Sequence, residues 1–174
     1  MSRSPFFSLI LLLLLFCSCG DSSIKNINFE DRSFVYLLED INPSSETFGL
    51  DVGPSHFEGK VLLSYFGHFQ WGTCATRFGE LNAVIKDLKS RDYNVELVGI
   101  GKQLHINSLQ DWTTDNDAPV CADKSPFPTW DGWDASQREL YILDQNGELI
   151  FQQNVTDSLP ENLTELIENV FTSS

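Results

Sequence analysis

The sequence predicts an α/β sandwich, in which a central mixed and mainly parallel sheet carries helices on both faces. Three observations predict it: an apolar run at residues 61–66 followed by a helical pattern, a second apolar run at 95–100, and a hairpin signal at Asn146-Gly147. A strand, a helix and a strand at this spacing form a βαβ unit, whose strands are parallel and whose crossover is right-handed. The alternation of strands and helices then predicts helices that pack on a sheet.

The N-terminus is expected to be a targeting segment, with a signal peptide at residues 1–18 and a polar tether at 19–30. The apolar stretch 6–16 is short for a bilayer span but suits a signal peptide. Small residues before Cys19 resemble a bacterial lipoprotein signal, which implies that Cys19 is lipidated; an ordinary signal peptide cleaved nearby is the alternative. The domain at 31–174 is therefore expected in the cell envelope, lipid-anchored and facing the periplasm or the exterior, or else secreted.

The composition limits the classes of partner. The formal net charge is −14, which argues against nucleic acid and against electrostatic docking to anionic lipid. We therefore expect an acidic soluble domain that meets the membrane only through its anchor. No motif calls for a cofactor or a metal ion.

The stretch 61–90 organises the domain, because a buried strand here leads into a long amphipathic helix that begins around Cys74. Thr73 is an acceptable N-cap for that helix. The positive end of the helix dipole favours thiolate over thiol at Cys74, and Arg77, one turn further on, could add to this effect. The apolar face of the helix is expected to consist of Phe78, Leu81, Ile85 and Leu88.

The same stretch, which reads YFGHFQWGTC, resembles the strand and active-site loop of the thioredoxin superfamily. Gly59-Lys60-Val61 before it resembles the opening of TlpA-like and peroxiredoxin-like domains. The resemblance implies a thioredoxin-like sandwich and thiol–disulfide redox chemistry. It departs at one position, since Trp71 stands where these families place the attacking cysteine. Cys74 then corresponds to the second, resolving cysteine, so the CxxC motif is incomplete.

Cys121 lies in the segment APVCAD, which resembles a short added strand of peroxiredoxins, TlpA-like proteins and the selenoprotein P N-terminal domain. That resemblance implies an outer strand beside the one at 95–100. Two interpretations are open: Cys121 resolves Cys74 after a loop movement, or it is a small buried core residue. The spacing does not decide whether the two cysteines pair.

The C-terminal third completes the fold. The segment YILDQNGELI predicts a hairpin and resembles the one that closes thioredoxin-like sheets. Those folds usually place a cis-proline just before the hairpin, where this chain has Gln137-Arg138. An apolar stripe at 159–171, with Pro160 in the first turn, predicts the closing helix.

Three hypotheses of function follow. The first is a thiol–disulfide redox role through Cys74, in a degraded active site with Trp71, Thr73, Arg77 and Cys121 around it, acting on protein thiols or disulfides. The second is a non-catalytic thioredoxin-like binding module with an envelope partner. The third is metal delivery, which would need further ligands, and His68 and His105 have no assigned role. Whether the chain is an enzyme is left open.

Overall fold

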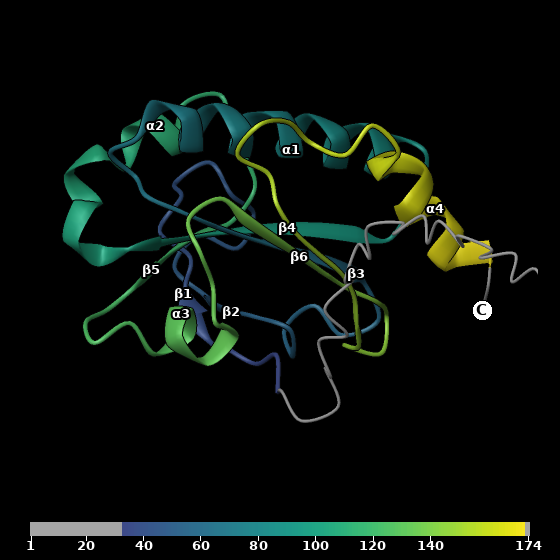
Figure 1. Ribbon diagram of the computed structural model, residues 1–174, viewed down its shortest axis with the longest axis horizontal. Coiled ribbons are helices and arrows are strands. Elements are labelled where there is room, and N and C mark those ends of the chain that lie inside the picture. The colour runs from purple at the N-terminus through teal and green to yellow at the C-terminus, as the bar shows by residue number, and fades with distance from the viewer. Residues whose placement is uncertain (1–32, 173–174) are drawn as a thin grey trace, which may run out of the picture.

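The computed structural model describes residues 33–172 and confirms the predicted class (Figure 1). The predicted signal peptide, the tether and Cys19 lie outside these residues. The main sheet has the order β5-β4-β3-β6-β7. Its strands are β3 (Val61–Gly67), β4 (Val95–Lys102), β5 (Val120–Asp123), β6 (Glu139–Leu143) and β7 (Leu149–Asn154). Strands β3, β4 and β5 are parallel, and β6 is antiparallel to both of its neighbours, β3 and β7.

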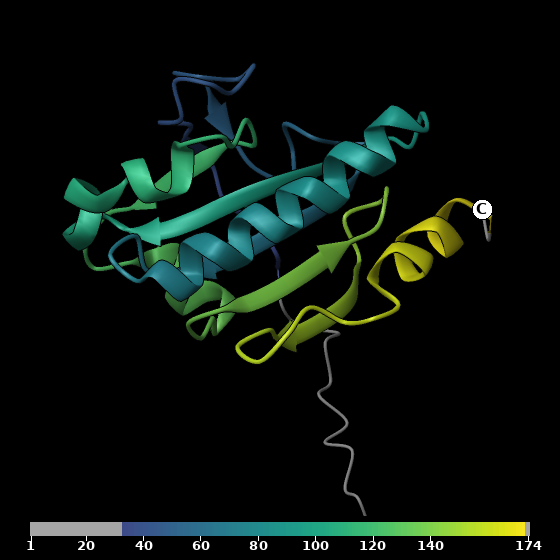
Figure 2. The same ribbon diagram turned by 90° about the horizontal axis from the view of Figure 1, so that it is seen from above.

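Helices cover both faces of the sheet, as the alternation predicts. In Figure 1, α1 and α2 lie above the sheet and α3 lies below it, and Figure 2 shows α1 running along the sheet. The helices are α1 (Gly72–Ser90), the 3-10 helix η1 (Gln103–Ser108), α2 (Gln110–Thr113), α3 (Pro128–Trp133) and α4 (Leu163–Thr172). No helix within residues 33–172 is long and apolar enough to cross a membrane.

The sheet separates two hydrophobic clusters, because the side chains of each strand alternate between its faces. One cluster joins α1, α2 and α4 to the sheet, and it contains the predicted apolar face of α1 together with Cys74. The other joins α3 and the N-terminal segment to the opposite face, and it contains Cys121. Each face of the sheet therefore has its own core and its own cysteine.

The apolar stretch 34–38 is typical of a strand, but the strand is limited to β1 (Leu38–Glu39), because only these residues pair with β2 (Asp51–Val52). One predicted boundary is wrong. The closing helix begins at Leu163 and not at 159, so Pro160 precedes the helix instead of lying in its first turn. The apolar stripe is still correct, since Leu163 and Ile167 are buried.

An ion-pair network ties the N-terminal ends of β3 and β4 to the C-terminal end of α1. The Glu96 carboxylate, only 8% exposed, contacts Lys60 Nζ at 3.2 Å and Lys89 Nζ at 2.6 Å. Buried carboxylates are stable only when they are paired in this way.

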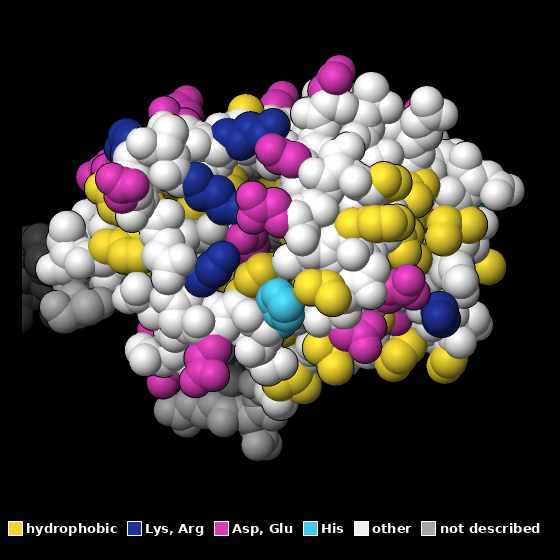
Figure 3. Space-filling model, turned by 180° about the vertical axis from the view of Figure 1, so that it is seen from behind, with side chains coloured by type: hydrophobic (Ala, Val, Ile, Leu, Met, Phe, Trp, Pro, Cys, Tyr) yellow, Lys and Arg dark blue, Asp and Glu magenta, His cyan; other side chains and the backbone are white. Residues whose placement is uncertain are grey.

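On the face shown in Figure 3, basic and acidic side chains are interspersed on one half, and hydrophobic side chains gather on the other.

Candidate functional site

Cys74 lies in the first turn of α1, at the end of the sheet where β3 and β4 finish. The helix begins at Gly72, and the amides of Cys74 and Ala75 donate to the carbonyl oxygen of Trp71 at 2.8 and 3.2 Å. Trp71 is therefore the N-cap residue and Thr73 is not, which corrects the sequence-based prediction. The exposed Thr73 side chain makes no cap hydrogen bond, since it already lies inside the first turn.

The sulfur of Cys74 is surrounded by hydrogen-bond donors from the loop before β6. Gln137 Nε2 donates to Sγ at 3.5 Å and Arg138 Nη1 at 3.8 Å. The cysteine itself is fully buried. Two N–H groups therefore approach the sulfur, which is the nucleophilic atom of a cysteine side chain.

Arg138 is held in place from several sides. Its Nε donates to Thr156 Oγ1 at 2.8 Å, and its backbone N–H donates to the Phe66 carbonyl at 2.8 Å. Its φ of +63° lies in the left-handed region, which is uncommon for a residue other than glycine. An uncommon backbone conformation fixed by hydrogen bonds on both sides is typical of a positioned functional residue.

Small residues allow this close packing. A Cβ atom on Gly67 would lie 2.7 Å from the Trp112 ring and 3.3 Å from Cys74 Cβ. Below the cysteine, the hydroxyl of Tyr65 donates to the Cys74 carbonyl oxygen at 3.3 Å. Burial, and next the Cys74 sulfur, raise the pKa of Tyr65, so its hydroxyl remains a proton donor.

Trp71 occupies the outer side of the site and is 46% exposed. Its ring stacks on His68 with centroids 5.6 Å apart, and the Arg138 guanidinium carbon lies 5.9 Å from the Trp71 ring centroid. An indole has no nucleophilic sulfur, so this position can bind but cannot form a disulfide.

Arg77 is engaged elsewhere. Its guanidinium pairs with Glu80 and donates to the carbonyl oxygens of Thr156 and Asp157, at 3.3 and 3.1 Å. Arg138 is the arginine that contacts the sulfur. In the sequence, Gln137-Arg138 stands out only because it replaces the usual cis-proline. Its position just before the hairpin strand, where that proline lines the substrate groove, is the one feature that could have indicated a place beside Cys74. Among residues 33–172 the cis peptide bond is at Ser125-Pro126.

The structure does not bring Cys121 to Cys74. Cys121 lies on the outer strand β5, as predicted, but its side chain packs on the opposite face of the sheet. Its thiol donates to the Leu38 carbonyl oxygen at 3.6 Å. Burial, and next the negative charges of Asp40, Asp51 and Glu39, raise the pKa of Cys121 well above its ordinary value. Both cysteines are free thiols.

His68 and His105 lie near the site, with ring centroids 5.3 Å apart. Burial, and next the positive charges of His105, Lys102 and Arg138, lower the pKa of His68. Within the described part of the chain, no three His, Cys, Asp or Glu side chains are placed together to hold a metal ion.

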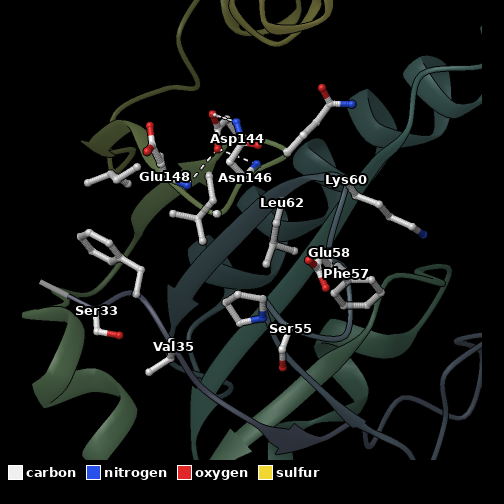
Figure 4. Close-up of a pocket in the computed structure, with 16 residues that line it drawn as sticks. Ser33, Val35, Ser55, Phe57, Glu58, Lys60, Leu62, Asp144, Asn146 and Glu148 are labelled. Atoms are coloured by element: carbon white, nitrogen blue, oxygen red, sulfur yellow. Dashed lines mark hydrogen bonds between the residues drawn. The ribbon is translucent and has the colours of Figure 1, made fainter. Parts of the chain in front are cut away.

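A pocket of about 810 Å³ lies at the other end of the sheet. In Figure 4, Leu62 of β3 lies between the turn residues Asp144 and Asn146 and the loop residues Ser55 and Phe57. Residue 62 is at the start of β3 and Cys74 follows its end, so this pocket and the cysteine lie at opposite ends of the sheet. We place the candidate site at the cysteine, where the reactive group is.

Comparison with known proteins supports the fold. A secreted disulfide oxidoreductase from Mycobacterium tuberculosis, homologous to E. coli DsbE, has a TM-score of 0.59 and 14% identity over 80% of this chain and 96% of its own. The mitochondrial 2-Cys peroxiredoxin of Plasmodium falciparum has a TM-score of 0.62 and 20% identity, over 82% and 91%. A SCO1/SenC family lipoprotein from Bacillus anthracis has a TM-score of 0.61 and 14% identity, over 79% of this chain and 93% of its own.

The chain matches no family model and no curated protein. The structural similarity nevertheless extends over most of residues 33–172 and over nearly the whole of each neighbour. Sheet order, the helix that follows β3 and the closing hairpin agree with the sequence-based resemblance. The chain therefore has the thioredoxin-like fold.

Proposed function

We propose that this chain is an envelope-anchored thioredoxin-fold protein that carries out thiol–disulfide exchange through Cys74 alone. The observation that carries the proposal is the contact of Cys74 Sγ with two N–H donors, Gln137 Nε2 and Arg138 Nη1. A sulfur that served only as core filling would have no need of a guanidinium beside it. The active site is degraded, because Trp71 stands in place of the first cysteine.

The exchange needs one cysteine and an external thiol. The Cys74 thiolate attacks one sulfur of a disulfide in a substrate protein, so a Cys74–substrate bond forms as the substrate's own S–S bond breaks. The departing sulfur leaves as a thiolate with the electron pair and takes up a proton from water. A thiolate of an external thiol then attacks the mixed disulfide and releases Cys74. Because Cys74 is buried, the side chains around it must move to admit the substrate.

Location outside the cytosol fits the same chemistry. Two of the structural neighbours are, by their own description, a secreted disulfide oxidoreductase and a lipoprotein. We propose that Cys19 carries the lipid, which Cys19→Ala and membrane fractionation would test. The wild type should sediment with membranes. If Cys19→Ala still sediments with membranes, and its N-terminal peptide differs from that of the wild type only by the substitution, Cys19 carries no lipid and the proposed anchor is contradicted.

The test of the redox proposal is mixed-disulfide formation with a small aromatic disulfide, followed by intact mass. The folded wild type should gain one adduct, which Cys74→Ser loses and Cys121→Ser keeps. Retention of the adduct in Cys74→Ser would contradict the proposal. So would two thiols that react only after denaturation.

A non-catalytic binding module is the second candidate, and two observations favour it: Trp71 is 46% exposed and Cys74 is fully buried. An exposed indole suits contact with a partner. This candidate predicts that Cys74→Ser leaves partner binding intact while Trp71→Ala weakens it. Metal delivery has no supporting observation among the described residues.

A further inference from the structure

Basic and aromatic side chains form a continuous strip beside Cys74. The strip consists of Arg138, Trp71, His68, His105, Trp130 and Lys102. His68 is its centre: its ring lies 5.6 Å from Trp71, 5.3 Å from His105 and 5.5 Å from Trp130 between centroids. Lys102 Nζ lies 4.6 Å above the Trp130 ring, at one end, and Arg138 lies over Trp71 at the other.

The strip is locally positive in a strongly acidic protein. The charges that act on His68 are those of His105, Lys102 and Arg138, and no carboxylate is among them. Asp123 is a nearby acid, on the strand beside Lys102. Its Oδ2 accepts from the backbone N–H groups of Thr129 and Trp130, and its Oδ1 is buried without a partner. The net charge of −14 does not cancel this local field, because charges further than about 10 Å away are largely screened at ordinary salt.

The strip also has unmet hydrogen-bonding capacity and an apolar border. Within the described residues, His68 Nδ1 and Trp130 Nε1 are buried without a partner, and the indole N–H can only donate. Leu104 and Ile106 beside His105 are 69% and 37% exposed, although both are apolar. Trp130 is buried, only 4% exposed, and forms the floor of the strip, whereas Trp71 is exposed and the other strip residues are partly exposed. The exposed part is an open surface, which suits an extended chain better than a small enclosed molecule.

We infer that this strip binds an acidic peptide segment of the protein whose disulfide meets Cys74. Carboxylates of the segment would lie against Lys102 and Arg138, and its apolar side chains against Trp71 and Leu104. The inference deepens the proposed function by naming its substrate class. The inference rests on the proposed function only in one respect, namely that the disulfide of the bound protein lies at Cys74.

The test measures binding of fluorescent, cysteine-free peptides by anisotropy. One peptide alternates Asp or Glu with Leu or Phe, and its partner carries Asn or Gln in place of each acid. The acidic peptide should bind about tenfold more tightly. Free glutamate should not compete for it, which separates a peptide site from a site for small organic acids.

Two lysine variants complete the test. Lys102→Gln should weaken binding of the acidic peptide about fivefold. Lys86→Gln removes the same charge from an exposed position on α1, where Lys86 pairs with Asp117, and should leave binding unchanged. Equal binding of the two peptides, competition by glutamate, or an equal effect of the two lysine variants would overturn the inference. Because the peptides contain no cysteine, none of these outcomes depends on whether Cys74 performs exchange.

Discussion

The two cysteines differ in their electrostatic surroundings and not in their burial. Cys74 and Cys121 are both fully buried and both free. The Cys74 sulfur receives N–H groups from Gln137 and Arg138, whereas the Cys121 thiol donates to a carbonyl oxygen and lies among carboxylates. Because burial is the same for both, the difference in partners is the reason that we propose Cys74, and not Cys121, as the reactive thiol.

The difference follows from where each residue sits on the sheet. Cys74 follows the end of a parallel strand at a helix N-terminus, where open α/β sheets place their ligand sites. Cys121 lies within a strand, and its register partner Ile100 packs in the same cluster. In the proposed function, Cys74 therefore belongs to the site and Cys121 to the core.

The largest expected effect is a difference of orders of magnitude in alkylation rate between the two thiols of the folded protein. Cys121 has a raised pKa because of burial and the charges of Asp40, Asp51 and Glu39, so its labelling rate should follow global unfolding. Cys74 should react faster than global unfolding allows. Quenched labelling over a denaturant series, with mass detection of each cysteine peptide, measures both rates. Equal rates would show that the two cysteines do not differ in reactivity.

Arg138 carries the next largest effect. Arg138→Gln removes the positive charge beside Cys74 Sγ, and we expect exchange at Cys74 to slow about tenfold, the equivalent of about 1.4 kcal/mol. Arg91→Gln removes the same charge at the other end of α1, where Arg91 pairs with Glu168 and Asp87, and serves as the matched control. Stopped-flow rates with a small disulfide provide the measurement. An unchanged rate in Arg138→Gln would mean that the contact is only structural.

How much of this could be predicted from sequence depends on whether the signal is local. Strand β3, helix α1 and the β6–β7 hairpin follow from apolar periodicity and an Asn-Gly turn, which are read within a few residues. The helix starts were misplaced because capping depends on backbone geometry: the first hydrogen bonds of α1 go to Trp71, although Thr73 has the better side chain.

The contacts that define the site are long-range. Arg138 is 64 positions from Cys74, and nothing local shows that its guanidinium meets that sulfur while Arg77, three positions away, turns to Glu80. The strand of Cys121 was predicted correctly. Whether its thiol meets Cys74 was left open, because a shift of one residue in register would move the thiol to the other side of the sheet.

A stability effect tests how tightly the Cys74 side is packed. Gly67→Ala places a Cβ atom 2.7 Å from the Trp112 ring, so we expect a loss of about 1–3 kcal/mol in the free energy of unfolding. Gly132→Ala, with nothing within 4 Å of its new Cβ, should be neutral or slightly stabilising. Urea unfolding of both variants measures this, and similar stabilities for the two would show that Trp112 can move aside.

The smallest expected effect is a pH dependence of the free energy of unfolding, which comes from His68, near Cys74. The pKa of His68 in the folded state is lowered below its ordinary value of 6.5, by burial and by the charges of His105, Lys102 and Arg138. The unfolded chain therefore binds a proton more readily, so this contribution to stability is present above about pH 6.5 and is lost as the pH falls below it.

His68→Gln should flatten the decline in stability between pH 7 and about pH 5, as measured by urea unfolding at each pH. Lys102→Gln should flatten it in part, because one of the charges that repel the proton is gone. If His68→Gln instead leaves the slope unchanged, neither the burial of His68 nor the charges around it contribute to the pH dependence of folding. A slope that flattens in His68→Gln but not in Lys102→Gln would assign the effect to burial, which is the larger cause of the lowered pKa of His68.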